Sequence, residues 1–421
     1  QWHTLTTADE WQSGGEDWPN AYRHSPISQA ESRGCIVCFW HAEREEPAFQ
    51  VYSSLLFGLP LAVTSFNRYS RLIEALGRRL TYSLVSLYFD DAHITDLQSG
   101  FGSSQQAFCQ LNSLLGTPFA EEKKQLMQPT GTFLGLDHDF TNLSRGFVTF
   151  WARDRLIQKT AAMITEAQAH NSLSSGQASK LYGMLNFLEQ GMYGRLGCAG
   201  LAAIKARQTE RNRDLTPELQ RNFDVIHSIL RHRPCRELPV RPSECLRFVV
   251  ASDAALEEPK QGTGGFLIVW HDPVGPVREA FIANISPEVY QLWEPGDRQI
   301  AQLEMVMIIY ALTYRAQTFR GRRGIWLIDN VASLMCLIRG RSHSPDLERM
   351  CGLIHVMLYA LRTWMYWEYI PSKSNWADAI SRLGWSDPWW RTNGFTPFSV
   401  SCPLCLWHLP LPAVIRVVEF L

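Results

Sequence analysis

The chain has 421 residues, of which 46% are hydrophobic and 19% are charged, a composition typical of globular domains and not of disordered chains. Its 40 Lys and Arg residues balance 41 Asp and Glu residues, and the net charge of −1 excludes a uniformly basic nucleic-acid-binding protein, although not a local basic channel. No apolar run reaches the length of a membrane span without a charge or a proline, and no signal peptide is present. The ten cysteines are too sparse for a disulfide scaffold. We therefore expect an intracellular protein, cytoplasmic or nuclear, with no membrane partner and an oligomeric state that the sequence leaves open.

The pattern of apolar residues changes three times along the chain. Short apolar strands and helices alternate at first, and a mostly helical stretch follows, in which Arg153–His170 and Ser175–Gln190 have helical spacing and Thr216 caps a further helix. A connector rich in Pro and Arg leads to the order strand, strand, strand, helix, strand, helix, helix, strand, helix. The remaining tail is rich in Pro and aromatic residues and has no clear period. The predicted segments are residues 1–140, 141–245, 246–390 and 391–421.

Four acids in the third segment stand at the ends or on the faces of predicted elements. Singly, each has an ordinary explanation as a turn, a cap or, for Glu304, a helix-edge residue with its carboxylate in solvent. Glu304 nevertheless lies on an apolar helical face with no cation within one turn, which is costly unless a partner from another element compensates. Together, several carboxylates suit phosphodiester hydrolysis by two Mg²⁺ ions about 3.5–4 Å apart. The four acids are Asp253, Glu304, Asp329 and Asp378.

The runs around these acids resemble the ribonuclease H domain of retroelement polyproteins over about residues 246–385. They are Val250–Asp253, Gln302–Glu304, Leu327–Asn330 and Ile370–Arg382. The resemblance implies a mixed five-stranded sheet with helices on its faces, and it implies that the four acids are catalytic and bind two Mg²⁺ or Mn²⁺ ions. One departure is that Lys373 and Asn375, and no histidine, precede Asp378, so turnover is expected to be slower than in cellular relatives.

A second acidic pair lies near the start of the chain, where Asp90 and Asp91 follow the apolar strand Leu84–Phe89. Adjacent acids at a hairpin tip are common in surface turns. Because the preceding strand is almost continuously apolar, we expect a packed hairpin instead.

Five runs in order resemble the palm of a reverse transcriptase: Asp17–Tyr22, Phe57–Pro60, Tyr88–Asp91, Ala120–Lys123 and Phe133–Leu136. The resemblance implies an antiparallel sheet with helices, in which Asp17, Asp90 and Asp91 are catalytic and bind two Mg²⁺ or Mn²⁺ ions. It also implies a nucleotide site with Phe57 and Gly58, in which the ring of Tyr22 excludes a 2′-hydroxyl. Lys123 would act near the pyrophosphate; Lys124 is an equally reachable alternative, and a solvated helix end is the plain explanation of both.

The palm resemblance has two departures. Asn20 replaces an acid that is common in the first motif. Because only sixteen residues precede Asp17, we expect this chain to lack a fingers region and to show negligible primer extension. The middle segment corresponds to a helical thumb and connection. Its basic residues are explained equally well by contacts to template–primer phosphates or by an amphipathic helical surface: Lys205, Arg207, Arg211, Arg213, Arg221, Arg231, Arg233, Arg236 and Arg241.

The sequence therefore predicts a multidomain α+β and α/β protein from a retrotransposon polyprotein. Its expected activity is RNA-directed DNA polymerisation coupled to ribonuclease H cleavage, with an RNA template, a DNA primer, dNTP and an RNA–DNA hybrid as partners. The alternatives are a ribonuclease H-type nuclease with a vestigial palm and a non-enzymatic nucleic-acid-binding relic. A relic should have lost some of the seven acids, and all seven are in place.

Overall fold

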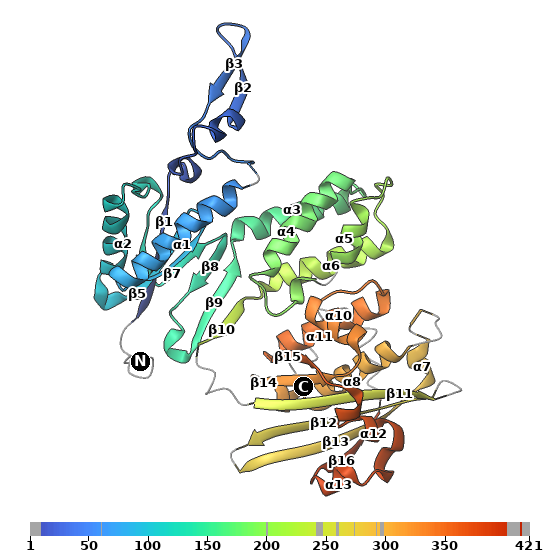
Figure 1. The fold of residues 1–421 in the computed structure, drawn as a ribbon. Coiled ribbons are helices and arrows are strands. Elements are labelled where there is room, and N and C mark those ends of the chain that lie inside the picture. Colours follow the sequence, from blue (N-terminus) through green and yellow to red (C-terminus); the bar gives the residue numbers. More distant parts are fainter. Residues whose placement is uncertain are drawn as a thin grey trace. The chain divides into compact units, whose positions relative to one another are not determined.

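The computed structural model describes residues 10–401, apart from 60, 199–200, 241–246, 258–260, 273, 292 and 295–298, together with 413–414. The chain divides into two compact units, residues 1–150 with 238–240 and residues 151–237 with 241–421 (Figure 1). The helical residues 151–237 thus belong to the same unit as the third predicted segment. Within the described residues, no helix has both the length and the apolar character that crossing a membrane requires.

The first unit is built on an antiparallel sheet of order β4-β5-β1-β6, with α1 and α2 packed against it. Its core contains Trp18, Phe66, Val85, Ile94 and Phe108, all almost fully buried. The sheet and helices have these bounds: β1 Trp11–Asp17, β4 Leu84–Tyr88, β5 Asp91–Leu97, β6 Gln125–Gln128, α1 Ala62–Leu80 and α2 Ser103–Leu114. A second sheet, of order β10-β9-β8-β7, comprises β7 Thr130–Phe133, β8 Leu136–Asp139, β9 Phe147–Ala152 and β10 Arg236–Pro239.

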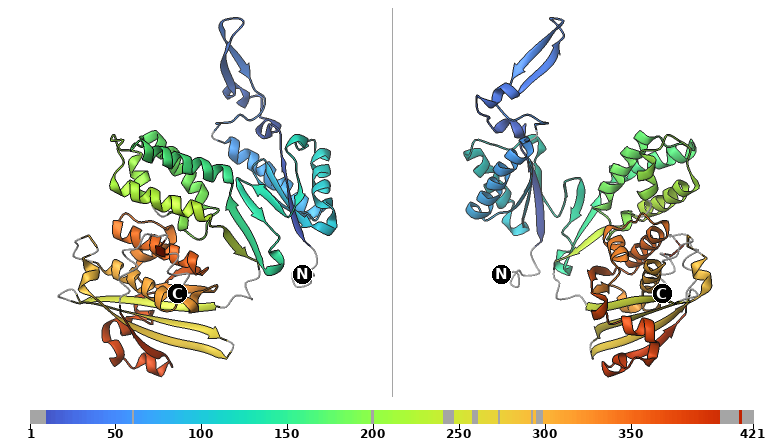
Figure 2. Two further views of the ribbon diagram at one scale, coloured as in Figure 1. Left: turned by 180° about the vertical axis from the view of Figure 1, so that it is seen from behind. Right: turned by 45° about the vertical axis from the view of Figure 1, so that its right-hand side comes forward.

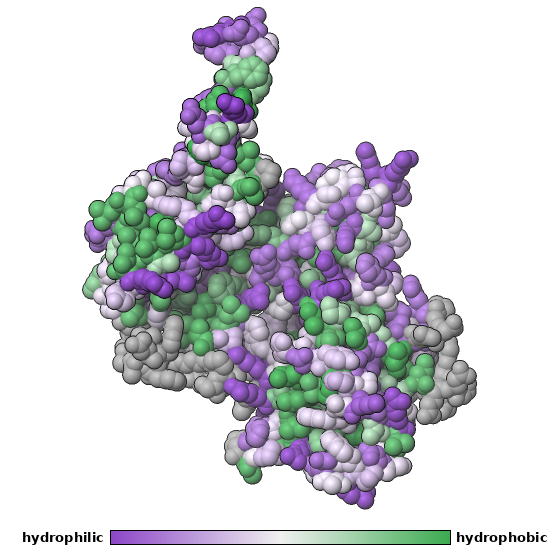
Figure 3. All heavy atoms as spheres, in the orientation of Figure 1, coloured by the Kyte–Doolittle hydropathy of each residue, from purple (hydrophilic) through white to green (hydrophobic). Residues whose placement is uncertain are grey.

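A two-stranded hairpin projects from the rest of the first unit (Figure 2). Its strands are β2 Ile36–His41 and β3 Glu46–Val51, and they pair with each other alone. Hydrophobic side chains are exposed along its stem, as the green residues below its tip show (Figure 3). A two-stranded hairpin has little core of its own, so it contributes little to the stability of the unit.

The helical part of the second unit consists of α3 Asp154–Ala169, α4 Ser175–Glu189, α5 Leu201–Arg207 and α6 Pro217–His232. The side chain of Ser174 accepts a hydrogen bond from the backbone of Gln177 in a capping box, and Thr216 caps α6 with Pro217 at the first helical position. The helices predicted over Arg153–His170, over Ser175–Gln190 and after Thr216 are confirmed.

The third predicted segment, with the start of the tail, forms a six-stranded mixed sheet of order β15-β14-β11-β12-β13-β16. The three consecutive strands that the sequence predicts are β11, β12 and β13, which form an antiparallel meander. Strands β14 and β15 run parallel to β11, and β16 runs parallel to β13. The strand bounds are β11 Arg247–Glu257, β12 Gln261–Asp272, β13 Gly275–Ile285, β14 Arg323–Ile328, β15 Trp364–Tyr369 and β16 Thr396–Val400.

The predicted number of five strands is therefore wrong by one, because the tail supplies β16. The strand has a proline, Pro397, which a sheet tolerates at its edge, and its five residues show no alternation of apolar and polar side chains. Phe398 stacks on Phe281 at 5.1 Å between ring centroids, and Arg315 lies over the ring of Phe398. These contacts with residues distant in sequence are what place the strand.

Helices cover both faces of this sheet (Figure 1). On one face α8 packs against β11, β12 and α11, and α8 is buried on all sides, as its apolar sequence requires. On the other face α12 packs against β11 and β12. The helix bounds are α7 Pro287–Tyr290, α8 Ile300–Tyr314, α9 Ala316–Phe319, α10 Val331–Arg339, α11 Pro345–Ala360, α12 Asp378–Leu383 and α13 Trp389–Thr392.

The packing of the second unit can be tested by replacing two of its glycines, one at a time, with alanine. A Cβ atom at Gly324, on β14, would overlap the ring of Phe248, whereas a Cβ at Gly183, inside α4, meets no atom within 4 Å. We expect Gly324→Ala to lower the free energy of unfolding by about 1–3 kcal/mol through overpacking. Gly183→Ala should raise it by up to about 1 kcal/mol, because alanine favours the helix. Thermal and urea unfolding of both variants measure the difference, and equal stabilities would contradict the packing of β14 against Phe248.

Candidate active sites

The register of two parallel strands places the first pair of acids in the second unit. Ala251 of β11 lies opposite Leu327 of β14, and two residues further along each strand stand Asp253 and Asp329. Alternate residues of a strand point to one face, so both carboxylates lie on the same side of the sheet at the same strand end. Strand β14 ends at Ile328, which leaves Asp329 at the edge of the site and half-buried.

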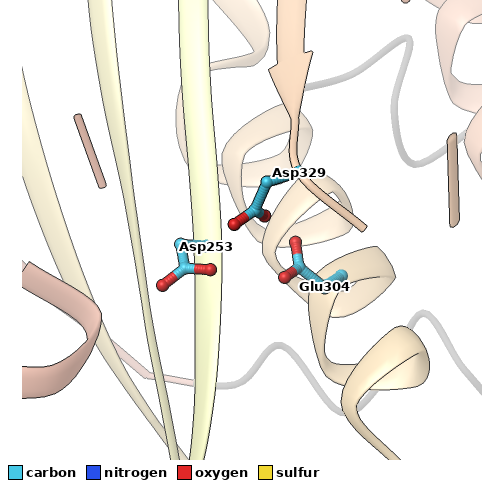
Figure 4. Close-up of side chains that lie close together, drawn as sticks. All are labelled: Asp253, Glu304 and Asp329. Carbon is cyan, nitrogen blue, oxygen red and sulfur yellow. The ribbon is translucent and has the colours of Figure 1, made fainter. Parts of the chain in front are cut away.

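The third acid comes from α8. Glu304 is only 3% exposed, so the alternative of a carboxylate in solvent is wrong. Oxygen atoms of Asp253, Glu304 and Asp329 lie within 4.8 Å of one another, and Figure 4 shows the three side chains turned toward a common point. Among the described residues this is the one such group of acids, histidines or cysteines.

Crowding and burial disfavour ionisation of these acids. Burial raises the pKa of Glu304 well above its ordinary value, and the charges of Asp253 and Asp329 raise it further. Burial also raises the pKa of Asp253 to about 6; a hydrogen bond from Ser381 opposes this shift, while Asp329 and Asp378 add to it. The Oε2 atom of Glu304 is buried and has no hydrogen-bond partner. A set of carboxylate oxygens with an unsatisfied buried member fits a hard divalent cation such as Mg²⁺ or Mn²⁺.

Asp378 lies beside this group and not within it. It is the first residue of α12, and its carboxylate accepts a hydrogen bond from Arg382 Nε at 2.9 Å. Asp378 is close enough to raise the pKa of Asp253. The loop before it is fixed by Asn375, whose buried amide donates to the Ser252 carbonyl at 3.0 Å, whereas Lys373 is exposed. The structure thus brings three of the four predicted acids together and holds the fourth next to them.

Sequence reasoning missed Ser381, which is buried and connects two of the acids. Its hydroxyl lies within hydrogen-bond distance of Asp253 Oδ2 and of the Asp378 carbonyl, and its own carbonyl accepts a hydrogen bond from Thr263 at 2.6 Å. Ser381 follows Asp378 by three residues, so the two lie on one face of α12. That spacing is the signal from which Ser381 could have been found.

The acids of the first unit meet at the end of its antiparallel sheet. Asp17 on β1 lies opposite Asp91 on β5, and Asp90 lies in the two-residue turn between β4 and β5. The turn residue Phe89 has a φ of 53°, a strained conformation that a hydrogen bond from Ser70 to its carbonyl helps to hold. Burial raises the pKa of Asp91, as do the charges of Asp90 and Asp17. Asp17, Asp90 and Asp91 do not converge as closely as the group in the second unit.

One cation reaches these acids. Lys123 Nζ lies 2.7 Å from Asp17 Oδ1, whereas Lys124 pairs with Glu121 at 3.5 Å. The hydrogen bond to Asp17 and the charge of Asp17 raise the pKa of Lys123, and Lys123 in turn opposes the upward shift at Asp91. Of the two lysines that the sequence left open, Lys123 is the one in contact with a predicted catalytic acid.

The predicted nucleotide-site residues surround the same sheet end. Tyr22 is buried, and its ring packs against Phe57 at 4.5 Å and Phe66 at 5.0 Å. Burial raises the pKa of Tyr22, and the charge of Asp90 adds to the shift. Phe57 is 77% exposed and Gly58 has a φ of 91°. Pro60, the last residue of that motif, lies outside the described residues.

Two of the basic residues that the sequence left open between phosphate contacts and a helical surface have partners within the protein. Arg207 is fully buried, donates to the carbonyls of Asn212 and Asp214, and pairs with Glu210 at 3.0 Å. Arg233 pairs with Asp154 at 2.9 Å. Arg241 lies outside the described residues. The amphipathic-surface explanation therefore accounts for Arg233, whereas Arg207 is a buried structural residue that fits neither explanation.

No protein-family model matches the sequence, and no curated protein matches it either. Among solved structures the chain is similar to a foamy viral protease-reverse transcriptase, designated dRH, in complex with double-stranded DNA, with a TM-score of 0.45 and 14% identity over 86% of this chain and 57% of that one. The chain is also similar to the foamy viral protease-reverse transcriptase in complex with an RNA/DNA hybrid, with a TM-score of 0.44 and 16% identity over 85% of this chain and 44% of that one. The similarity to the foamy viral protease-reverse transcriptase in complex with double-stranded DNA has a TM-score of 0.44 and 15% identity over 85% of this chain and 67% of that one. The chain spans about half the length of the first two.

The raised pKa of Asp253 predicts how its charge affects stability without metal. A carboxyl whose pKa is near 3.8 when unfolded and about 6 when folded favours the folded state fully below pH 4, and this contribution is lost as the pH rises through 6. We expect Asp253→Asn in EDTA to be more stable than the unsubstituted chain by up to about 3 kcal/mol above pH 7, with no gain below pH 4. Urea unfolding from pH 4 to 8 measures this difference.

The matched control is Asp214→Asn, an exposed acid between α5 and α6. It should show no such gain in stability above pH 7. Mg²⁺ should raise the melting temperature of the unsubstituted chain at pH 7.5 and not that of Asp253→Asn. A pH-independent difference between Asp253→Asn and the unsubstituted chain would show that repulsion among the acids is not its cause.

Proposed function

We propose that the second unit is a ribonuclease H-type nuclease that cleaves the RNA strand of RNA–DNA hybrids in a reaction dependent on Mg²⁺ or Mn²⁺. The observation that carries the proposal is the group of Asp253, Glu304 and Asp329, whose oxygen atoms lie within 4.8 Å and include one buried, unpartnered atom. The ligand set contains carboxylates alone, which favours hard cations over zinc or copper. The choice of substrate rests on the resemblance of the four acidic runs to retroelement ribonuclease H domains.

The residues of the site have different proposed roles, which follow from their positions. Asp253, Glu304 and Asp329 would hold the cations, with Asp378 completing the set at the start of α12. Ser381 fixes the carboxylate of Asp253 through its hydroxyl, and Asn375 fixes the approach to α12. Bound divalent cations would supply charge neutralisation of the phosphate and a water of lowered pKa.

The test uses the full chain with labelled RNA in an RNA–DNA hybrid, in double-stranded RNA and as a single strand. We expect cleavage of the hybrid alone, dependent on Mg²⁺ or Mn²⁺ and abolished by EDTA. Asp329→Asn keeps the shape of the side chain but removes a ligand, and it should lower the rate by at least about 100-fold, since even residues that only support a ligand contribute 10–100-fold. Asp224→Asn is the control. Equal cleavage by Asp329→Asn would rule out this site, and equal cleavage of all three substrates would rule out hybrid specificity.

We infer a second activity, nucleotidyl transfer, for the first unit. The observation that favours it is the register of β1 and β5, which sets Asp17 opposite Asp91 with Asp90 in the adjoining turn. Lys123 offsets part of this negative charge, and Tyr22 lies beside Asp90, where the sugar of a nucleotide held by the acids would be. Once a fingers region is supplied, the two units together would copy RNA into DNA from a DNA primer and degrade the copied RNA, as in a retrotransposon polyprotein.

The ring of Tyr22 is expected to select the sugar. In the full chain with Mn²⁺, dATP should bind more tightly than ATP, and Tyr22→Ala should reduce the ratio of the two dissociation constants by about tenfold, because the space for a 2′-hydroxyl opens. Tyr22→Phe keeps the ring and should keep the ratio. Because Tyr22 is buried, thermal unfolding must first show that both variants fold. An unchanged ratio in a folded Tyr22→Ala would place the sugar elsewhere.

A further inference from the structure

One corner of the second unit contains buried hydrogen-bond donors that have no acceptor. Tyr193 follows α4 and is only 6% exposed, and its ring packs against Trp364 at 4.7 Å and Tyr359 at 5.9 Å. Its hydroxyl makes no hydrogen bond. Arg323 is the first residue of β14 and lies opposite Trp364 of β15. The Nε and Nη2 atoms of Arg323 are also buried and have no partner.

The charges around Tyr193 are mostly positive. Arg323, Arg362 and Glu237 are close enough to affect its pKa, which burial raises far above its ordinary value, so Tyr193 remains a neutral donor. Arg236 donates to the Gln190 carbonyl at 3.4 Å, close to Tyr193 in the chain, and its Nε is buried without a partner. Among the ion pairs between described residues, Glu237 forms none with these arginines. Two guanidinium groups and one carboxylate thus lie within electrostatic range of Tyr193, and Arg236 is held nearby through the Gln190 carbonyl.

A buried donor without an acceptor costs about 1–3 kcal/mol, and native structures rarely retain such groups unless an ion or water satisfies them. The unsatisfied atoms of Arg323 and Arg236 can only donate, and the Tyr193 hydroxyl can donate as well, so a partner rich in acceptors would satisfy all of them. Guanidinium groups match the oxygens of a phosphate in geometry and charge, and a tyrosine hydroxyl adds a neutral donor. We propose that Tyr193, Arg323, Arg362 and Arg236 form a binding site for a phosphate group.

This phosphate site is separate from the acidic group. Arg323 begins β14 and Asp329 follows its end, so six residues of strand, about 20 Å, separate the two. The bound phosphate is therefore not the one attacked at the acids. It belongs either to the backbone of a nucleic acid or to a free phosphate or nucleotide, and the donors are the same for both. The proposal does not rest on the proposed nuclease activity.

The experiment uses the full chain in EDTA, so that neither cleavage nor metal binding contributes. The first probe is inorganic phosphate, which is compared with chloride at equal ionic strength; its binding is measured as an increase in the melting temperature. The other is a labelled RNA–DNA hybrid long enough to extend beyond 20 Å, read as fluorescence anisotropy. The variants are Tyr193→Phe, which keeps the ring packing, and Arg323→Gln. The control is Arg339→Gln, an exposed arginine in the last turn of α10.

We expect Tyr193→Phe and Arg323→Gln each to lower the affinity for at least one probe by about fivefold or more, which is the contribution of one hydrogen bond. Arg339→Gln should leave both affinities unchanged. Lower affinity for both probes, or for phosphate alone, identifies a site for free phosphate. Lower affinity for the hybrid alone identifies a contact with the nucleic-acid backbone. Tyr193→Phe should also raise the melting temperature in chloride, because it removes an unsatisfied buried hydroxyl. Unchanged affinity for both probes in both variants, or no binding of either probe by the unsubstituted chain, would overturn the proposal.

Discussion

The parallel pairing of β11 with β14 is the constraint on which the site in the second unit depends. The pairing of Ala251 with Leu327 brings Asp253 and Asp329 to one strand end, and the burial of α8 against the same strands adds Glu304. Three carboxylates this close repel one another, and burial increases the cost. The fold imposes this arrangement through its backbone register, so the cost cannot be relieved by moving one side chain. It is relieved by protonation, as the raised pKa values of Glu304 and Asp253 indicate, or by a bound cation.

The first unit meets the same problem with a different arrangement. An antiparallel register sets Asp17 against Asp91, but these acids lie at a more open sheet end, and Lys123 contacts Asp17. A cation from the chain therefore offsets part of the repulsion, and the upward shift of the pKa of Asp91 is smaller than it would be without Lys123. Acids that are buried and unpaired retain a stronger need for an external cation than acids that have a lysine beside them. The second unit thus presents the more demanding metal site.

Much of both sites could be predicted because the acids stand at strand ends and helix starts, where short motifs and local patterns are informative. The sequence left Glu304 open between the core and solvent, and only tertiary packing shows it to be buried. Strand β16 was missed because its pairing depends on Phe281 and Arg315, more than 80 residues away in sequence. The sequence left Arg207 open between a phosphate contact and a helical surface, because its partners include the backbone carbonyls of Asn212 and Asp214, which no side-chain pattern reveals. Local chemistry was predictable, and long-range pairing was not.

Strand β14 links two regions of opposite charge. Its carboxyl end carries Asp329 among the acids, and its amino end carries Arg323 among the guanidinium groups. A polyanion approaching the acids alone would be repelled until cations were bound, whereas donors about 20 Å away along a rigid strand attract it at a fixed distance. Because β14 is a central strand, paired on both sides, that distance cannot vary as it would between two loops. The orientation of any long phosphate-bearing ligand on this unit would therefore follow from the direction of one buried strand.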